Sequence, residues 1–131
     1  MATINGTSGN DTLTGTNGAD IINGYAGDDI INGGNGNDVI DAGSGADIVS
    51  GGAGDDIFKM SSVSSGMPKS SYDGGTGIDT LDYSVSGSFM FWSFDSKTGL
   101  YNIRDVNFRG MEKLIGGSGQ DIFNLGTISD S

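Results

Sequence analysis

The sequence predicts an all-β fold, a right-handed two-sheet β-solenoid that ends in a C-terminal hairpin. Three observations predict it: an unbroken nine-residue period over residues 6–59, glycine and aspartate at fixed places in that period, and a large apolar residue at its eighth place. Since side chains alternate between the faces of a strand, an odd period in one flat sheet would turn successive units to opposite faces. A coil with two strands and two turns per circuit of about 18 residues keeps every apolar side chain inside.

The six units each predict one tight turn followed by one short strand. They read GTSGNDTLT, GTNGADIIN, GYAGDDIIN, GGNGNDVID, AGSGADIVS and GGAGDDIFK. Glycines at fixed places favour a turn over positions 1 to 6. Positions 7 to 9 are rich in Ile and Val, which suits a strand of about three residues. The inward residues at position 8 are Leu13, Ile22, Ile31, Ile40, Val49 and Phe58.

Outside this block the period is interrupted, although the 131 residues are expected to form one domain. Thr3 and Ile4 can supply a first short strand ahead of the units. Residues 60–73, which are rich in serine, predict an irregular surface loop. Isolated units return at 74–82, with the sequence GGTGIDTLD, and at 116–124, with the sequence GGSGQDIFN, followed by a tail at 125–131.

Residues 83–115 predict a capping hairpin and a connector. The segment FMFWSF at 89–94 is apolar on both faces, as in a buried strand. Residues 100–108 alternate and are expected to pair back onto it, while 109–115 form the connector. The aromatic residues of this region predict a cap on the apolar interior, which solenoids require at their ends. Alternatively, Trp92 and Tyr101 form a platform for a sugar.

The composition of the chain excludes several classes of function. The chain carries 17 acidic and 6 basic residues, a net charge of −11, which argues against nucleic acid or an anionic membrane as partner and favours a bound cation. It contains no Cys and no His, so disulfides, zinc–thiolate sites and histidine triads are excluded. No stretch approaches the 18 apolar residues of a membrane span. The adjacent carboxylates Asp28–Asp29 and Asp55–Asp56 lie along turns instead of across a cleft, so no enzyme is expected.

The aspartates at position 6 predict a metal site. Odd units place Asp11, Asp29 and Asp47 on one edge of the coil, and even units place Asp20, Asp38 and Asp56 on the other. Carboxylates stacked at the strand spacing of about 4.8 Å repel one another unless a cation lies between them. Calcium accepts six to eight oxygens in flexible geometry, whereas magnesium demands a strict octahedron. Asp79 is expected to join Asp47, and Asp121 to join Asp56.

Turn chemistry alone also favours aspartate, but it would tolerate Asn or Ser at some of these positions. All eight units have Asp there, which favours calcium. Position 5 varies among Asn, Ala, Asp, Ile and Gln, so its side chain is not expected to be a ligand.

The units resemble the G-G-x-G-x-D-x-U-x nonapeptide of the repeats-in-toxin (RTX) family, in which U is a large apolar residue. Position 2 departs from this pattern at Thr7, Thr16 and Tyr25, and position 1 departs at Ala42. The resemblance implies a parallel β-roll, calcium between the turns of units n and n+2, and type I secretion by a bacterium. The metal residues it implies are Gly9, Asp11, Gly18, Asp20, Gly27, Asp29, Gly36, Asp38, Gly45, Asp47, Gly54, Asp56, Gly77, Asp79, Gly119 and Asp121.

Pairing units n and n+2 within the block gives four sites, and the isolated units raise the expectation to about four to six ions. Their charge of about +8 to +12 would nearly cancel the net charge of −11. We therefore expect a monomeric, calcium-binding module that folds when calcium binds, as part of a larger extracellular bacterial polypeptide. The alternatives are an adhesin module and a polysaccharide-binding module like those attached to alginate epimerases.

Overall fold

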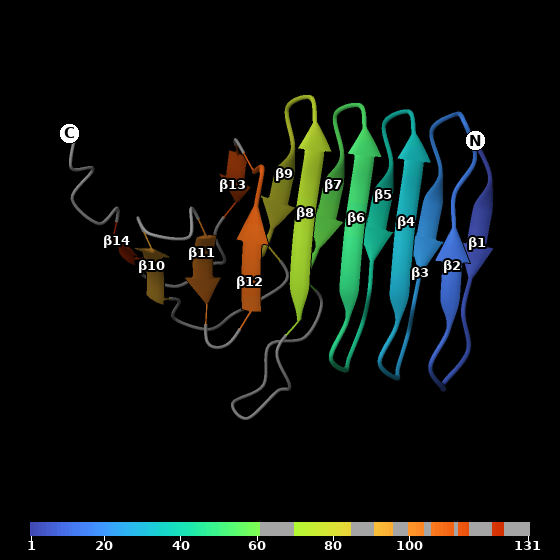
Figure 1. Ribbon diagram of the computed structural model, residues 1–131, viewed down its shortest axis with the longest axis horizontal. Helices are drawn as coiled ribbons and strands as arrows, with labels where there is room; N and C mark the ends of the chain where they lie inside the picture. Colours follow the sequence, from blue (N-terminus) through green and yellow to red (C-terminus); the bar gives the residue numbers. More distant parts are fainter. Residues whose placement is uncertain are drawn as a thin grey trace.

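The computed structural model describes residues 1–60, 70–84, 91–95, 100–103, 106–111, 113–115 and 122–124. Within these residues the chain is all-β and winds through two sheets, which face each other along the length of the molecule (Figure 1). The six-stranded sheet has the order β1 (Thr3–Asn5), β3 (Ile21–Asn23), β5 (Val39–Asp41), β7 (Ile57–Lys59), β9 (Thr80–Asp82) and β13 (Lys113–Ile115). The eight-stranded sheet has the order β14 (Ile122–Asn124), β10 (Phe91–Asp95), β11 (Leu100–Ile103), β12 (Val106–Arg109), β8 (Ser71–Thr76), β6 (Ile48–Ala53), β4 (Ile30–Asn35) and β2 (Thr12–Thr14).

The predicted parallel β-roll is confirmed by the strand register. From β1 to β7 successive strands alternate between the sheets, and neighbours within a sheet are parallel and offset by 18 residues, as in the pairing of Ile22 with Ile40. The position-8 side chains fill the space between the sheets, and Ile22, Ile40 and Phe58 are fully buried. Leu13 and the lead-in residue Ile4 are partly buried at the N-terminal end. Hydrophobic burial between stacked circuits therefore holds the roll together, as expected for a solenoid.

The predicted irregular loop at 60–73 is wrong for its last residues. Strand β8 begins at Ser71, and Tyr72 pairs with Val49 at the inward position, 23 residues later instead of 18. The Tyr72 ring packs edge-on against Phe58, with centroids 6.0 Å apart. An outward Ser71 and Asp73 on either side of a buried ring have the alternation of a strand, which the serine-rich composition conceals. The other residues of this segment up to 69, apart from Met60, lie outside the described part of the chain.

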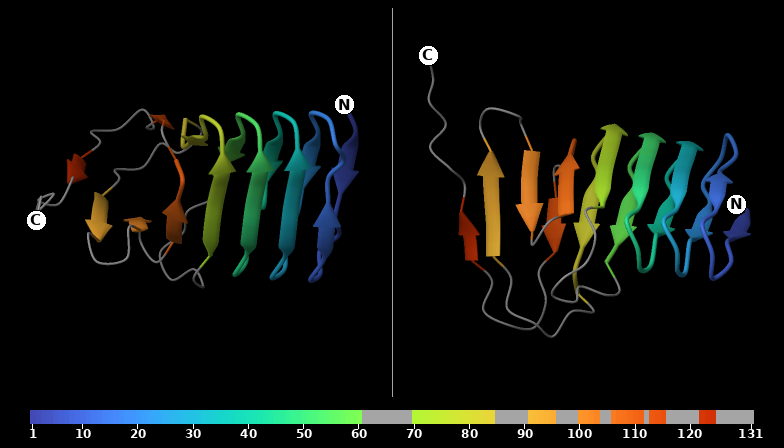
Figure 2. Two further views of the ribbon diagram at one scale, coloured as in Figure 1. Left: turned by 45° about the horizontal axis from the view of Figure 1, so that its top comes forward. Right: turned by 60° about the horizontal axis from the view of Figure 1, so that its bottom comes forward.

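The C-terminal region prolongs both sheets (Figure 2). Strands β10 and β11 are antiparallel, which confirms the predicted hairpin. Residues 100–108 contain two strands where one was expected, because β12 turns back antiparallel to β11 and then runs parallel to β8. The connector carries β13, parallel to β9. The predicted roles of the aromatic side chains, including Trp92 and Tyr101, fall outside the described residues.

In the described part of the chain there is no helix with the length and apolar character needed to cross a membrane.

Candidate metal centre

The aspartates at position 6 form one ladder along each edge of the roll, as predicted. In each ladder, the backbone N–H of one aspartate donates to Oδ1 of the aspartate one circuit further on. The N···O distance is 2.9 Å from Asp11 to Asp29 and 3.0 Å from Asp29 to Asp47 on the odd edge. On the even edge, Asp20 donates to Asp38, and Asp38 to Asp56, both at 2.8 Å. One carboxylate oxygen of each acceptor is therefore consumed in joining successive circuits.

The expected position of Asp79 on these ladders is wrong. Asp79 accepts from the backbone of Asp56 at 2.9 Å, on the even edge, instead of joining Asp47. Ser70 takes the place after Asp47: its Oγ accepts the Asp47 N–H at 3.0 Å. The half-circuit that ends in β8 therefore moves the unit of Asp79 to the opposite edge. Gly119 and Asp121 lie outside the described residues, so the expected pairing of Asp121 with Asp56 stays a prediction.

The second carboxylate oxygen distinguishes two kinds of turn. In the turns 24–29, 33–38, 42–47 and 51–56, which we call the open turns, Oδ2 of the aspartate is buried and accepts no hydrogen bond. The aspartates concerned are Asp29, Asp38, Asp47 and Asp56, each at most 1 % exposed. A buried carboxylate oxygen without a donor is unfavourable, so these turns require a further partner.

Three of these aspartates have a raised pKa because they are buried. Burial raises the pKa of Asp38, and it raises the pKa of both Asp47 and Asp56 to about 6, against the opposing effect of the backbone hydrogen bond that each accepts. Neighbouring carboxylates on the same ladder raise these pKa values further. Burial and the repulsion between neighbouring carboxylates both disfavour the ionised form, and a bound cation would offset both.

In the first circuit the same oxygen is hydrogen-bonded within its own turn. We call the turns 6–11 and 15–20 the closed turns. Oδ2 of Asp11 accepts the Thr7 N–H at 2.6 Å and the Thr7 hydroxyl at 2.9 Å. Oδ2 of Asp20 accepts the same two groups of Thr16 at 2.6 and 2.8 Å. The backbone N–H of Thr16 is the main reason why the pKa of Asp20 is lowered, followed by the N–H of Ala2.

The backbone of the open turns also differs from that of the closed turns. In the open turns positions 2 and 4 have positive φ, for example 101° at Gly34 and 102° at Gly36. Gly9 and Gly18, at position 4 of the closed turns, do not. Instead their N–H groups donate to the hydroxyls of Thr7 and Thr16. The position-4 glycines are therefore conformationally necessary only from the third turn onward.

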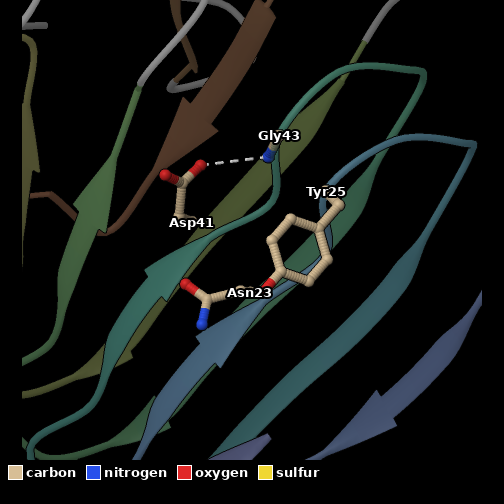
Figure 3. A pocket seen from close by; sticks show the side chains of 4 residues that line it. All are labelled: Asn23, Tyr25, Asp41 and Gly43. Atoms are coloured by element: carbon tan, nitrogen blue, oxygen red, sulfur yellow. Dashed lines mark hydrogen bonds between the residues drawn. The ribbon is translucent and has the colours of Figure 1, made fainter. Parts of the chain in front are cut away.

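Tyr25 holds position 2 of the third turn with φ of 75°, the only positive φ among described residues other than glycine. Figure 3 shows its ring turned toward Asn23, beside a pocket of about 130 Å³ that Asp41 and Gly43 also line. The Tyr25 hydroxyl donates to Oδ1 of Asn5 at 3.3 Å. Its side chain thus lies away from the carboxylate of its own turn, and the Asp29 oxygen stays without a donor.

In the open turns that begin with glycine, 24–29, 33–38 and 51–56, this first residue lies close to the carboxylate. A Cβ added at Gly24 would stand 2.6 Å from Oδ2 of Asp29, and one added at Gly33 would stand 2.5 Å from Oδ2 of Asp38. Both would also come within 2.4 Å of a carbonyl oxygen one circuit further on. Glycine at position 1 therefore leaves space in which carboxylate and carbonyl oxygens approach each other.

Comparison with protein families agrees with this geometry. Residues 5–40 and 24–58 match the model of the RTX calcium-binding nonapeptide repeat, which comprises four copies. Residues 5–58 are an RTX repeat array. Comparison with curated proteins finds no significant match. The RTX repeats make this part of the chain a calcium-binding structural module.

The donor set of the RTX turns fits calcium. Nowhere among the described residues do three or more carboxylate, imidazole or thiol side chains converge on a point that could hold a metal. Backbone carbonyl oxygens, however, lie near the carboxylates of the glycine-led turns and could complete a site with them. Calcium accepts such mixed oxygen ligands, whereas softer metals prefer nitrogen and sulfur.

A further ladder at position 5 of the RTX units was not predicted. Oδ1 of Asn10 accepts the Asp28 N–H at 2.9 Å, and Oδ1 of Asn37 accepts the Asp55 N–H at 3.0 Å. Asp28 and Asp55 in turn accept from Ala46 and Ile78. Each of these side chains therefore uses one oxygen to accept a backbone N–H at the surface, and the expectation that they are not required ligands stays a prediction. Asn or Asp stands at position 5 in four of the six units, which is the sequence signal that could have indicated this ladder.

Proposed function

We propose that calcium bound at the aspartate ladders completes the turns of the roll and that the module folds when the ions bind. One observation carries this proposal: four buried carboxylate oxygens, on Asp29, Asp38, Asp47 and Asp56, have no hydrogen-bond donor. These four aspartates are the ligands we propose first. Asp79 continues the even ladder with the same turn backbone, since Gly75 and Gly77 also have positive φ. The carbonyl oxygens of the glycine positions supply the other ligands.

The energetics favour coupling between binding and folding. Burying ionised carboxylates without a partner costs free energy, and the cost grows with each added circuit. Bound calcium replaces the lost hydration and cancels the repulsion within each ladder. Because the separated aspartates of an unfolded chain do not form the site, each ion stabilises the folded state by about 2.7 kcal/mol when its concentration is a hundredfold above the dissociation constant.

This coupling suits a secreted protein. Extracellular calcium modules bind with dissociation constants of about 0.1 to 1 mM, so they stay empty at cytosolic calcium levels. A chain that is unfolded inside the cell can pass through an export channel and fold outside. We therefore propose a folding and structural module of a larger, type I-secreted bacterial protein, located outside the cell and monomeric in itself.

A calcium titration followed by Trp92 emission and far-ultraviolet circular dichroism tests the proposal. In excess chelator we expect a spectrum of a largely unfolded chain, and with millimolar calcium we expect β-sheet ellipticity and a shift of the Trp92 emission together. Magnesium at the same concentration is the control and is expected to restore little structure. A chain with full β-sheet ellipticity in chelator would contradict the proposal.

Polysaccharide binding and an adhesin role stay predictions. A sugar platform depends on the side chains of Trp92 and Tyr101, of which the structure describes the strand positions alone. Of the basic residues, Arg109 is paired, since its Nε donates to Oδ2 of Asp73 at 2.8 Å. Calorimetry against alginate in calcium would test this role separately from folding.

A further inference from the structure

We infer that the first circuit of the roll binds no calcium, because Thr7 and Thr16 donate to the carboxylate oxygens that a cation takes in the open turns. This inference rests on the proposed function and divides the ladder into two parts. Asp11 and Asp20 join circuits without an ion, and calcium binding begins with Asp29 and Asp38. Thr7 and Thr16 are thus positioning residues that replace a metal.

The hydrogen bonds are the first support. Asp20 is as buried as the aspartates of the open turns, yet its Oδ2 accepts two hydrogen bonds from Thr16. Oδ2 of Asp38, one circuit further on the same ladder, accepts none. Charge-assisted hydrogen bonds of this length satisfy a carboxylate well. A calcium ion at Asp20 would have to displace both donors, so it gains less there than at Asp38.

The end of the roll is the second support. Strands β1 and β2 are the outermost strands of their sheets, so the closed turns have a neighbouring turn on one side only. An ion at either closed turn would therefore receive oxygens from one neighbouring turn only, and on the other side of Asp20 the Ala2 N–H already donates to Oδ1 at 2.7 Å. Hydrogen bonds within the turn are therefore the better way to close this end.

Tyr25 shows that threonine itself, and not merely the loss of glycine, closes a turn. Position 2 of the third turn has neither glycine nor threonine, yet it adopts the positive φ of the open turns. Its carboxylate, on Asp29, has an unsatisfied oxygen like the rest. A hydroxyl at Cβ together with an N–H directed at the carboxylate is what distinguishes Thr7 and Thr16.

Exchange of position 2 between the two kinds of turn tests the inference. We expect Tyr25→Thr to close the third turn and to lower the number of bound calcium ions by one, and Thr7→Gly/Thr16→Gly to open the first circuit and to raise it. The measurement is bound calcium per chain, by equilibrium dialysis at buffered calcium and atomic absorption. The matched control is Tyr25→Gly, which restores the residue of the other open turns and is expected to leave the number unchanged.

The outcomes separate this inference from the proposed function. Equal ion numbers in Tyr25→Thr and Tyr25→Gly would overturn it while wild-type binding stands. A wild-type chain that binds no calcium would overturn the proposed function instead. If Tyr25→Thr fails to reach the wild-type ellipticity in calcium, the Thr7→Gly/Thr16→Gly variant decides, and an unchanged ion number there overturns the inference. Thr7→Ser/Thr16→Ser keeps both hydroxyls and is expected to bind as many ions as the wild type.

Discussion

The closed turns of the first circuit and the open turns that follow share one repeat, with glycine, aspartate and an apolar residue in the same places. They complete the aspartate in different ways. In the closed turns the N–H and the hydroxyl of one threonine both donate to Oδ2 of the aspartate. In the open turns the same oxygen is buried without a donor. A repeat therefore does not by itself define a metal site, because one residue at position 2 decides whether the carboxylate is available.

The comparison also separates two functions of the aspartate. Oδ1 joins successive circuits through a backbone N–H in both kinds of turn, as in the bonds from Ala2 to Asp20 and from Asp20 to Asp38. Only Oδ2 differs. Replacement of aspartate by asparagine keeps an oxygen for the first function and removes the charge needed for the second, so it can isolate the metal contribution.

The largest effect is expected for Asp38→Asn compared with Asp11→Asn. Asp38→Asn removes a buried charge from an open turn, so it should abolish at least one calcium ion and about 2.7 kcal/mol of stability at calcium a hundredfold above the dissociation constant. Asp11→Asn can still accept from Thr7 with its remaining oxygen and should cost about 1 kcal/mol at any calcium level. Denaturant unfolding at several calcium concentrations measures both. If the stability of both variants depended equally on calcium, the division into closed turns without an ion and open turns with one would be contradicted.

Alanine at position 4 should have opposite effects in the two kinds of turn. Gly36 has φ of 102°, and an added Cβ would stand 2.6 Å from the backbone nitrogen of Ala19. Gly36→Ala should therefore destabilise the calcium-bound roll by about 2 kcal/mol or more. Gly18 has ordinary φ and nothing within 4 Å of an added Cβ, so Gly18→Ala should stabilise by about 0.4 to 1 kcal/mol. Thermal unfolding of the pair in calcium distinguishes them, and equal losses would show that the backbone contrast is absent.

Much of this architecture could be predicted from the sequence because the repeat imposes it. The inward residues, the two edges and the 18-residue circuit all follow from one period and from the alternation of side chains. The prediction failed where a strand of the roll does not carry the residues of the nine-residue repeat. The half-circuit ending in Tyr72 has Ser70 where other units have aspartate, and it follows an insertion, so the sequence does not mark it as a unit. Because this strand was missed, Asp79 was predicted on the wrong edge of the roll.

The threonine bonds lie beyond sequence reasoning for a different reason. Thr7 and Thr16 are visible as departures from glycine, but their contact with the aspartate four residues later depends on the path of the turn. Tyr25 departs from glycine at the same position and makes no such contact. Only the backbone angles and the hydrogen bonds separate the two cases, and these come from the packing of one circuit on the next.

Acidification of the calcium-free chain should affect the two kinds of turn in opposite directions. Asp47 and Asp56 have a folded-state pKa of about 6, above the unfolded value, so the folded state binds protons more tightly and gains stability as the pH falls from 7 toward 4. The pKa of Asp20 is lowered, so its contribution is present above about pH 4 and is lost below it. In metal-depleted buffer we therefore expect β-sheet ellipticity to increase between pH 7 and pH 5.

The control for this pH effect is Asp47→Asn/Asp56→Asn, which removes both raised groups. Its calcium-free ellipticity should change less between pH 7 and pH 5 than that of the wild type. An equal gain in the variant would assign the effect to the general loss of negative charge, and a wild-type loss of ellipticity over this range would contradict the burial of these carboxylates.

The smallest effects are expected at position 5, where the ladder runs through both kinds of turn. Asn10→Ala removes the exposed side-chain oxygen that accepts the backbone N–H of Asp28, and Asn37→Ala removes the one that accepts the backbone N–H of Asp55. Because water can hydrate the released N–H groups, each should cost about 0.5 to 1 kcal/mol in calcium, as measured by denaturant unfolding, and neither should change the ion number. Loss of an ion in Asn37→Ala but not in Asn10→Ala would mean that the position-5 side chain contributes to the metal site, and the contrast between the turns would then extend beyond positions 2 and 6.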